Sequence, residues 1–267
     1  MSRRAKLLTI SSILLVIIIA LYIWGYAMQT VSYTVDSDKI TEKFKIVFIS
    51  DLHNCSYGGS DQSQLMDAID EASPDIVIFG GDVIDQYGGT DNALTLMSEA
   101  SENYNCCYCP GNHELKRGDL DEFEEDVAEL GVHVLDSDYC QFTINGQEVR
   151  VYGILYASRL KAIEQPIDDS CYNILLAHRP EEIDSYLNKG FDLILSGHAH
   201  GGQWRIPHIL EQGIYAPDQG LFPDYTNGMF TYGDTVHIIS KGLARPLRMI
   251  LIPRIFNRPE FTIIKIQ

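Results

Sequence analysis

The sequence predicts an α/β fold with two stacked β-sheets flanked by helices, preceded by one transmembrane helix. In the first half of the chain, apolar runs of strand length alternate with amphipathic helical stretches. An antiparallel hairpin follows, and the rest of the chain is rich in strands, which favours two packed sheets. The 267 residues suffice for one large domain, and no internal repeat or low-complexity tract divides them.

The first residues have the composition of a membrane anchor. The run from Leu7 to Met28 contains no charge and is long enough for a helix to cross a bilayer. Basic residues precede the run and aromatic residues close it: Arg3, Arg4 and Lys6, then Tyr22, Trp24 and Tyr26. The positive-inside rule places the basic end in the cytoplasm and the remaining chain outside. A cleaved signal peptide, with Gly25-Tyr26-Ala27 as a weak cleavage site, is the alternative.

The organisation expected from this reading has three parts. Residues 1–28 form a cytoplasmic tip and a single-pass anchor in the cell membrane. Residues 29–43 form a polar linker that enters an edge strand, and residues 44–267 form one domain outside the cytoplasm. Strands are expected at 44–50, 75–79, 105–109, 132–135, 142–144, 148–153, 173–177, 192–195, 235–240 and 261–266. Helices are expected at 61–72, with Ser60 as N-cap, and at 91–103, 120–130 and 180–187.

The charge balance excludes nucleic acid as a partner. The formal net charge is −17, and because the first 28 residues hold three basic residues and no acid, the remainder carries −20. A domain of this charge repels polyanions, so any phosphate group must be attracted locally by a metal or a basic patch.

The six cysteines are expected to be small buried residues, with room for one disulfide at most. Cys106 and Cys107 are adjacent on an expected strand, so their side chains should face opposite sides of the sheet. The Cys106–Cys109 spacing lacks the second cysteine pair of a structural zinc site.

Five short groups of polar residues carry the chemistry, and all but one follow an apolar run. Read singly, the Asp-x-His, Gly-Asp and lone His groups are weak, because Asp is common in turns and a lone His after a buried run is usually a core residue. The strongest single group is Gly197-His198-Ala199-His200. Strand ends in a layered α/β fold converge on one edge, so the groups should meet in space. Their candidate metal ligands are Asp51, His53, Asp82, Asn112, His178, His198 and His200.

The residue types indicate the role of each group. Asp51 and His53 are two apart, so in an extended backbone both point the same way and can bind one ion together. His198 and His200, two imidazoles after a strand and among glycines, indicate a pair of metal ligands. A carboxylate such as Asp82 can bridge two metals, and Asn112 offers a neutral oxygen. His113, beside Asn112, points elsewhere and can donate a proton to a leaving oxygen. Oxygen and nitrogen ligands without thiolate suit Mn, Zn or Fe rather than Ca.

These motifs (Asp-x-His, Gly-Asp, Gly-Asn-His-Glu, His and Gly-His-x-His) resemble, in order and completely, those of the calcineurin-like metallophosphoesterase superfamily. The resemblance covers about residues 44–267 and is strongest to a branch of small, membrane-anchored or exported bacterial phosphodiesterases. It implies a four-layer αββα sandwich of two mixed sheets and two divalent metal ions. By the family pattern, Asp51, His53, Asp82 and His200 hold one ion, and Asp82, Asn112, His178 and His198 hold the other.

The resemblance also implies a reaction. A metal-bridging hydroxide attacks phosphorus in line, Asp82 bridges the ions, and His113 protonates the leaving group. Gln86 departs from the pattern of phosphoprotein phosphatases, which have an arginine there that clamps phosphate with two hydrogen bonds. This departure disfavours a protein phosphatase.

The segment from Lys241 to Arg258 is basic and apolar in an otherwise acidic domain. One hypothesis places it on anionic headgroups, with Arg245 and Arg248 beside Asn112 and His113 as candidate substrate contacts. A packed loop whose arginines snorkel to solvent is the alternative.

The function expected from the sequence is two-metal hydrolysis of a small or lipid-linked phosphodiester or phosphomonoester outside the membrane. A nucleotide–lipid pyrophosphatase is one alternative, although it needs a cytoplasmic substrate. A metal-binding interaction scaffold without catalysis is the other, and the presence of Asp82 and His113 opposes it.

Overall fold

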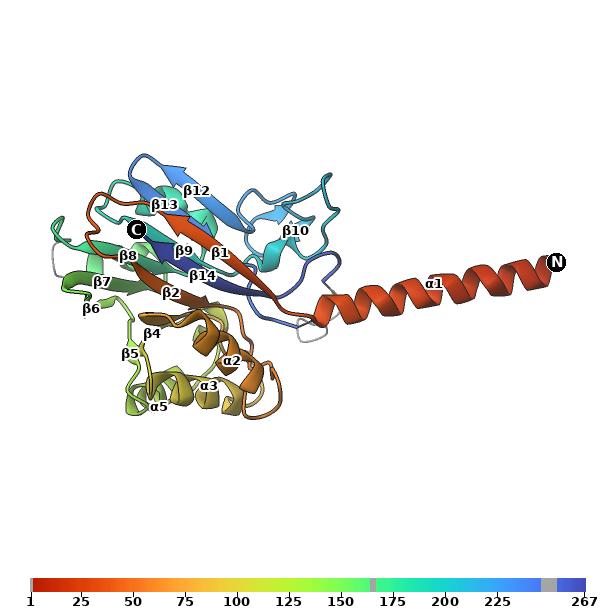
Figure 1. Ribbon diagram of the computed structural model, residues 1–267, viewed down its shortest axis with the longest axis horizontal. Helices are drawn as coiled ribbons and strands as arrows, with labels where there is room; N and C mark the ends of the chain where they lie inside the picture. The colour runs from red at the N-terminus through yellow and green to blue at the C-terminus, as the bar shows by residue number, and fades with distance from the viewer. Residues whose placement is uncertain (1, 164–166, 246–253) are drawn as a thin grey trace.

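The computed structural model describes residues 2–163, 167–245 and 254–267. One long helix at the start of the chain is followed by two packed six-stranded sheets (Figure 1). Helix α1, Arg3–Tyr26, projects away from the sheets, and Ser2 caps it by accepting a hydrogen bond from the Ala5 amide at 3.2 Å. Within the described chain, α1 is the helix that is long and apolar enough to span a membrane.

The first sheet has the strand order β1-β14-β2-β3-β4-β5. Its strands are β1 Gln29–Val35, β14 Glu260–Ile266, β2 Phe44–Ile49, β3 Ile76–Gly80, β4 Asn105–Cys109 and β5 His133–Val134. Strand β14 runs parallel to β1 and antiparallel to β2, and the remaining pairs are parallel. The stretch 29–43, expected as a linker that enters an edge strand, contains the edge strand β1 as far as Val35, whose backbone pairs with the last strand of the chain.

Helices α2 Ser63–Ala72, α3 Asp91–Ser101 and α5 Leu120–Glu129 cover the outer face of the first sheet (Figure 1). The expected N-cap of α2 is wrong. The helix starts at Ser63 instead, after Gln62 in the left-handed conformation at φ 50°. The Gln62 side chain bonds the Tyr57 amide and the Cys55 carbonyl, which fixes the loop that leads into the helix.

The second sheet has the order β12-β13-β9-β8-β7-β6. Its strands are β6 Asp138–Ile144, β7 Gln147–Ile154, β8 Tyr172–Ala177, β9 Leu193–Ser196, β12 Gly228–Tyr232 and β13 Thr235–Ile239. Asn145 and Gly146 both have positive φ, 51° and 83°, as the predicted hairpin turn between β6 and β7 requires. The sequence reading missed β12, whose half-exposed residues show no apolar run.

Short helical turns cover the outer face of the second sheet: η1 Ala157–Ala162, η2 Pro180–Glu182 and α6 Ile183–Tyr186. The helix expected at 180–187 is thus a 3₁₀ turn followed by one α-turn. Between the two sheets lies an apolar core that includes the fully buried Phe48, Ile78 and Ile174. Helices, sheet, sheet and helices form the expected four-layer αββα sandwich.

The parallel strands of both sheets end at one edge of the sandwich, where the remaining short elements gather. Helix α4 Asn112–Leu115 follows β4, and the turn η3 His200–Gly202 follows β9. Beyond η3, the small hairpin of β10 Tyr215–Ala216 and β11 Gly220–Leu221 lies at the same end of the molecule as the inner end of α1 (Figure 1).

All six cysteines are buried and form no disulfide in the structure. Cys106 packs in the core under the helices and Cys107 in the core between the sheets, so the two side chains face opposite ways as predicted. Burial raises the pKa of the Cys106 thiol to about 12 and also raises the pKa of Cys107 and Cys109.

We therefore expect the native full-length protein to resist thiol reagents. Burial keeps all six thiols from the reagent, and the raised pKa values of Cys106, Cys107 and Cys109 further reduce their thiolate at neutral pH. Titration with a chromogenic disulfide reagent should detect no thiol in the native protein and all six after unfolding in guanidinium without a reductant. A deficit of two thiols in the unfolded protein would reveal a disulfide and contradict this expectation.

Candidate metal centre

The loops at the common edge bring the seven predicted metal ligands together. The loop after β2 carries the first pair, the turn after β3 carries Asp82, α4 begins with Asn112, and the loops after β8 and β9 carry the last three histidines. None is more than 7% exposed: Asp51, His53, Asp82, Asn112, His178, His198 and His200. Residues far apart in sequence thus form one buried cluster.

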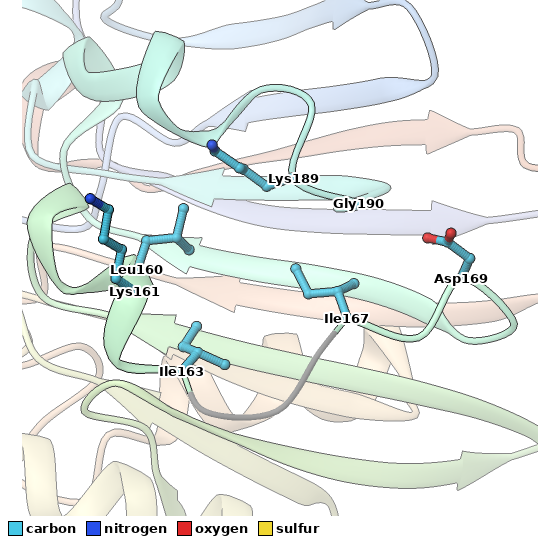
Figure 2. Close-up of a pocket in the computed structure, with 7 residues that line it drawn as sticks. All are labelled: Leu160, Lys161, Ile163, Ile167, Asp169, Lys189 and Gly190. Atoms are coloured by element: carbon cyan, nitrogen blue, oxygen red, sulfur yellow. The ribbon is translucent and has the colours of Figure 1, made fainter.

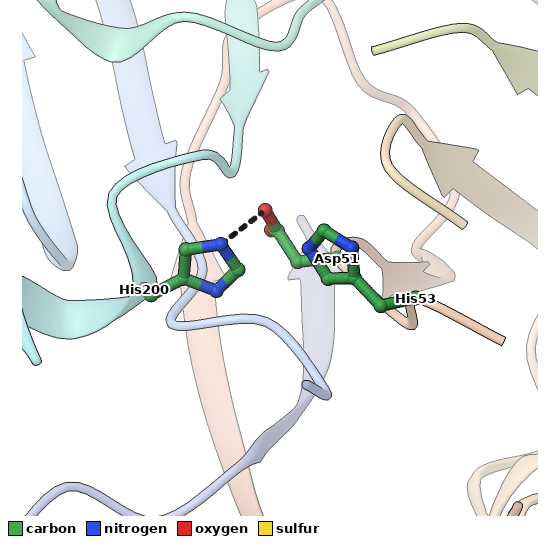
Figure 3. A group of neighbouring side chains, drawn as sticks. All are labelled: Asp51, His53 and His200. Carbon is green, nitrogen blue, oxygen red and sulfur yellow. Dashed lines mark ion pairs between the residues drawn. The ribbon is translucent and has the colours of Figure 1, made fainter. Parts of the chain in front are cut away.

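Asp51 lies at the centre of this cluster. Its Oδ1 is 3.9 Å from Nε2 of His178 and 3.7 Å from Nε2 of His200. With His53 and His200 it forms a group whose candidate ligand atoms all lie within 4.8 Å of one another (Figure 3). This group corresponds to one of the two predicted ion sites.

Asp82 joins a second group to the first. It lies with His178 and His198 in a set of candidate ligand atoms within 4.8 Å, and its Oδ2 is 3.2 Å from Nε2 of His178. The same Oδ2 is 4.0 Å from Nε2 of His53 in the first group. Asp82 therefore occupies the position that a bridging ligand requires.

The donor atoms fit divalent cations. Asp51 Oδ2 and Asn112 Oδ1 are buried and make no hydrogen bond among the described residues, and Nε2 of His178 faces only the carboxylates of Asp82 and Asp51. Buried polar atoms nearly always have a partner, so two such oxygens in one cluster fit a cation-binding site. The cluster contains carboxylate, amide and imidazole groups and no thiolate, a donor set that suits Mn, Zn or Fe.

The backbone of the cluster is strained. Five candidate ligands adopt left-handed φ values between 47° and 68°, which are uncommon outside glycine: Asp51, His53, Asp82, His198 and His200. Each such residue costs about 1–3 kcal/mol and persists only where its surroundings enforce it. Strain concentrated at these positions indicates that side-chain placement here has a function.

Glycines allow the loops to close around the carboxylates. A Cβ atom at Gly111 would overlap the Asp82 carboxylate, and one at Gly197 would overlap that of Asp51. Gly242, which follows β13, packs against the Asp51 side chain from another direction. The glycines that flank the sequence motifs thus let the neighbouring backbone approach the carboxylates.

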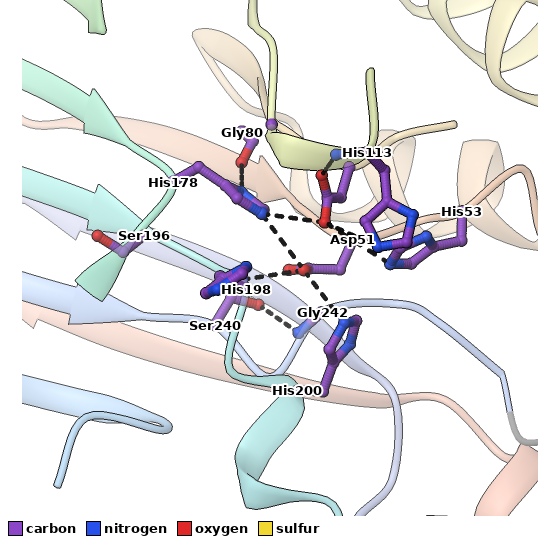
Figure 4. Close-up of polar contacts among 12 residues, drawn as sticks. Asp51, His53, Gly80, His113, His178, Ser196, His198, His200, Ser240 and Gly242 are labelled. Atoms are coloured by element: carbon purple, nitrogen blue, oxygen red, sulfur yellow. Dashed lines mark hydrogen bonds and ion pairs between the residues drawn. The ribbon is translucent and has the colours of Figure 1, made fainter. Parts of the chain in front are cut away.

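Hydrogen-bond partners outside the set of candidate ligands orient two of the histidines. The Nδ1 of His178 lies 2.9 Å from the Gly80 carbonyl, which leaves Nε2 for a cation (Figure 4). The Nε2 of His198 lies 2.9 Å from Oδ2 of Asp218, which leaves Nδ1. Sequence reasoning missed Asp218, because one acidic residue in a long loop carries no signal.

Glu114 binds two of the site loops together. Its buried carboxylate accepts hydrogen bonds from the amides of Gly111 (2.9 Å), Asp82 (2.9 Å) and Ile84 (3.1 Å). Burial and then the charge of Asp82 raise the pKa of Glu114 to about 7. The motif contained this glutamate, but its structural role depends on contacts that the sequence does not show.

His113 faces the cluster from its more open side and is held by Asp85. Its Nδ1 is 2.7 Å from Oδ1 of Asp85, and its Nε2 is 4.0 Å from Oδ2 of Asp82. Burial would lower the pKa of His113, but the hydrogen bond to Asp85 and the charge of Asp82 outweigh it, so the pKa is raised. Sequence reasoning missed Asp85, although it lies only three residues after Asp82.

Arg254 lies behind the cluster and not on the surface, which for this residue agrees with the packed-loop alternative and not with the membrane-facing patch. It is 3% exposed, donates to the Lys241 carbonyl at 2.8 Å, and lies 3.2 Å from Nδ1 of His200. Arginine can only donate, so His200 in this arrangement holds its proton on Nε2. A cation at Nε2 would require the ring proton to move to Nδ1, and Arg254 would then lose its hydrogen bond to this ring.

The structure describes one of the two arginines that were predicted as substrate contacts. Arg245 lies over the Tyr57 ring at 4.0 Å and the Tyr26 ring at 6.0 Å, and it belongs to neither ligand group. Arg248 lies outside the described residues. Their contact with substrate stays a prediction.

A cavity of about 550 Å³ lies away from this cluster (Figure 2). It is lined by Leu160, Lys161, Ile163, Ile167, Asp169, Lys189 and Gly190. None of these residues is a predicted metal ligand or proton donor, so the chemistry of the chain belongs to the loop cluster.

Comparison with known proteins agrees with this geometry. The calcineurin-like phosphoesterase family pattern matches residues 44–202, more than half of the chain, so the chain belongs to this family. It is 26% identical over 261 residues to the uncharacterized metallophosphoesterase YkuE of Bacillus subtilis, covering 93% of this chain and 88% of YkuE.

The chain covers different shares of two further relatives. The phosphodiesterase YaeI of Escherichia coli is 25% identical over 235 residues, covering 84% of this chain and 82% of YaeI. A zebrafish (Danio rerio) transmembrane protein with a metallophosphoesterase domain is 24% identical over 266 residues, and the chain spans 60% of its length. The chain is a metal-dependent phosphoric ester hydrolase, and its apolar N-terminal helix is typical of a membrane anchor.

We expect Asp82→Asn to remove most of the bound metal. The amide keeps the size of the side chain but loses the charge that two cations would share. Metal content of the purified full-length protein, measured by mass spectrometry, should fall from about two equivalents to below one. Asp85→Asn is the matched control, since Asp85 bonds His113 and not the ligand groups. Equal metal content in both variants would contradict the role assigned to Asp82.

Proposed function

We propose that this chain hydrolyses phosphodiesters or phosphomonoesters with two divalent cations, on the outer side of the cell membrane. One observation carries the proposal: two buried ligand groups meet at Asp82, and Nε2 of His113 faces the same carboxylate. Such an arrangement binds a phosphate group on one side and offers a proton donor on the other.

We assign to each cation the candidate ligands that lie together in the structure. Asp51, His53 and His200 would hold one cation, His178, His198 and Asn112 the other, and Asp82 would bind both. Two bound cations lower the pKa of a water molecule toward neutrality and stabilise charge on the attacking and leaving oxygens. The glycines and the strained loops keep the ligands in place for this purpose.

His113 supplies the proton for the leaving oxygen. With Nδ1 donating to Asp85, the other ring nitrogen, Nε2, holds the proton that is transferred. Asp85 fixes the ring orientation and raises the pKa of His113, so that the imidazolium persists closer to neutral pH. Asp85 is thus a positioning residue for the donor.

The membrane side follows from the sequence at the start of α1. Arg3, Arg4 and Lys6 precede its apolar stretch, and no acidic residue lies among the first 28. The positive-inside rule then places the domain outside the cytoplasm.

The test of the proposed activity is hydrolysis of an aryl phosphodiester by the full-length protein with Mn, Zn, Fe or Mg. We expect cleavage that a chelator abolishes and added metal restores. Absence of metal-dependent cleavage of both an aryl diester and an aryl monoester would overturn the proposal.

We expect His113→Ala to retain metal and lose about 10²–10⁴-fold in kcat, the usual contribution of a proton donor. The loss should be larger for an alkyl than for an aryl leaving group, because a poorly stabilised alkoxide needs the proton more. Parallel kcat measurements on matched aryl and alkyl phosphodiesters check this. An equal loss on both would remove the assigned role.

We expect Asp85→Asn to shift the alkaline limb of the pH–kcat profile to lower pH. The carboxylate raises the pKa of His113, so its removal lets the imidazolium lose its proton at lower pH, and the protonated donor is lost earlier as pH rises. An unchanged limb, with metal content intact, would show that Asp85 does not set the protonation of the donor.

We expect protease added to intact cells to digest the domain. The basic residues before α1 hold the N-terminus in the cytoplasm, which leaves the domain exposed outside. A tag at the N-terminus should remain protected, and both ends should become sensitive once the membrane is permeabilised. Protection of the domain in intact cells would reverse the proposed orientation.

A further inference from the structure

An exposed apolar surface lies on the segment 203–227, which we call the β10–β11 lobe because it contains that hairpin. The exposed fractions are 80% for Ile209, 68% for Leu221 and 63% for Phe222, and 46% for Ile206. Phe222 also has a left-handed φ of 56°, an unusual conformation for a bulky side chain. Large side chains of this kind, gathered on one lobe, mark an interaction surface.

The lobe is joined to the end of the anchor helix. Trp204 pairs with Ile255 in a parallel bridge, and the Arg205 amide donates to the Ile255 carbonyl at 2.9 Å. The next residue, Phe256, packs edge-on against Trp24 of α1 at 6.0 Å between ring centroids. Figure 1 shows the lobe and the inner end of α1 at the same end of the molecule. A bilayer that α1 spans would therefore begin beside the lobe.

We propose that the β10–β11 lobe docks on the bilayer that α1 spans, with Ile206, Ile209, Leu221 and Phe222 in the interfacial layer. Aromatic and branched aliphatic side chains at a membrane boundary gain stability as apolar surface leaves water. The residues outside the first 28 carry a charge of −20, so attraction to anionic headgroups does not hold the domain there. The contact is apolar and depends little on salt.

Docking of the lobe brings the metal centre to the lipid surface. His200 lies four positions before Trp204, and the Ile214 amide of the lobe donates to the Gly202 carbonyl at 2.9 Å. Asp218, also in the lobe, pairs with the metal-centre residue His198. The substrate class that fits this placement is a phosphoester carried by a lipid. This step rests on the proposed hydrolase activity, whereas the docking itself does not.

The two tryptophans of the chain, Trp24 and Trp204, allow a direct test of docking. In Trp24→Phe, Trp204 is the only tryptophan and reports on the lobe. We expect its emission to shift to the blue and to be quenched when the full-length protein is reconstituted in vesicles of brominated phosphatidylcholine. The effect should persist at high salt. Trp204→Phe, which leaves Trp24 in the anchor, is the positive control.

A charged variant tests the surface itself. In the Trp24→Phe background, Ile209→Asp with Phe222→Asp should abolish the quenching of Trp204. Met229→Asp introduces the same charge on an exposed apolar residue of the edge strand β12 and should leave the quenching unchanged. No quenching before the charges are introduced would overturn docking. A blue shift of Trp204 without bromine quenching, lost as the protein concentration falls, would instead assign the lobe to a second copy of the chain.

Turnover measurements on two substrates test the proposed membrane docking and the proposed hydrolase activity independently. We compare hexadecyl 4-nitrophenyl phosphate placed in the vesicles with methyl 4-nitrophenyl phosphate in water. The Ile209→Asp, Phe222→Asp variant should lose about tenfold or more on the lipid-like substrate and keep its rate on the methyl ester. Equal losses on both would overturn the assigned substrate class. If neither substrate is cleaved while Trp204 is quenched, the hydrolase proposal fails and docking stands.

Discussion

The structure depends on the burial of two carboxylates, Asp51 and Asp82, where the ends of two sheets meet. Burial raises the pKa of Asp51 to about 6. For Asp82, burial acts in the same direction, but the charge and hydrogen bond of His178 outweigh it and hold its pKa below the usual range. The same carboxylates raise the pKa of His178 to about 10. Without cations, a proton on His178 thus balances part of the buried negative charge, and divalent cations bound at these atoms would replace that proton and balance the charge in its place.

The surrounding architecture keeps these charges in a fixed arrangement. Glu114 ties the loops after β3 and β4 together through three backbone amides, and glycines let both loops press against Asp82. In the described parts of the connection from β13 to β14, Gly242 packs against Asp51 and Arg254 lies beside His200. These two residues, which belong to the segment that the sequence also suggested as a membrane patch, close one side of the site.

The difference between what the sequence predicted and what it missed has a physical cause. Asp51, Asp82 and His198 could be predicted because each follows a buried strand, and parallel strand ends share one edge. Asp85, Asp218 and Arg254 could not, because their partners lie far away in sequence or across a loop of unpredictable path. Strand β12 was missed because it is an edge strand with both faces half exposed, and the helix at 180–187 is broken although Pro180 suggested a regular start.

The junction between anchor and domain is very short, since only Ala27 and Met28 separate α1 from β1. Strand β1 is paired with β14 along its whole length, and Arg258 donates to the carbonyls of Ala27 and Met28. A flexible linker would let the domain change its position and orientation relative to the anchor helix, whereas this junction restricts both. With α1 in a bilayer, this junction would hold the metal centre at a constant height and tilt above the lipid, and encounters with a lipid-borne substrate would reduce to lateral diffusion in a plane.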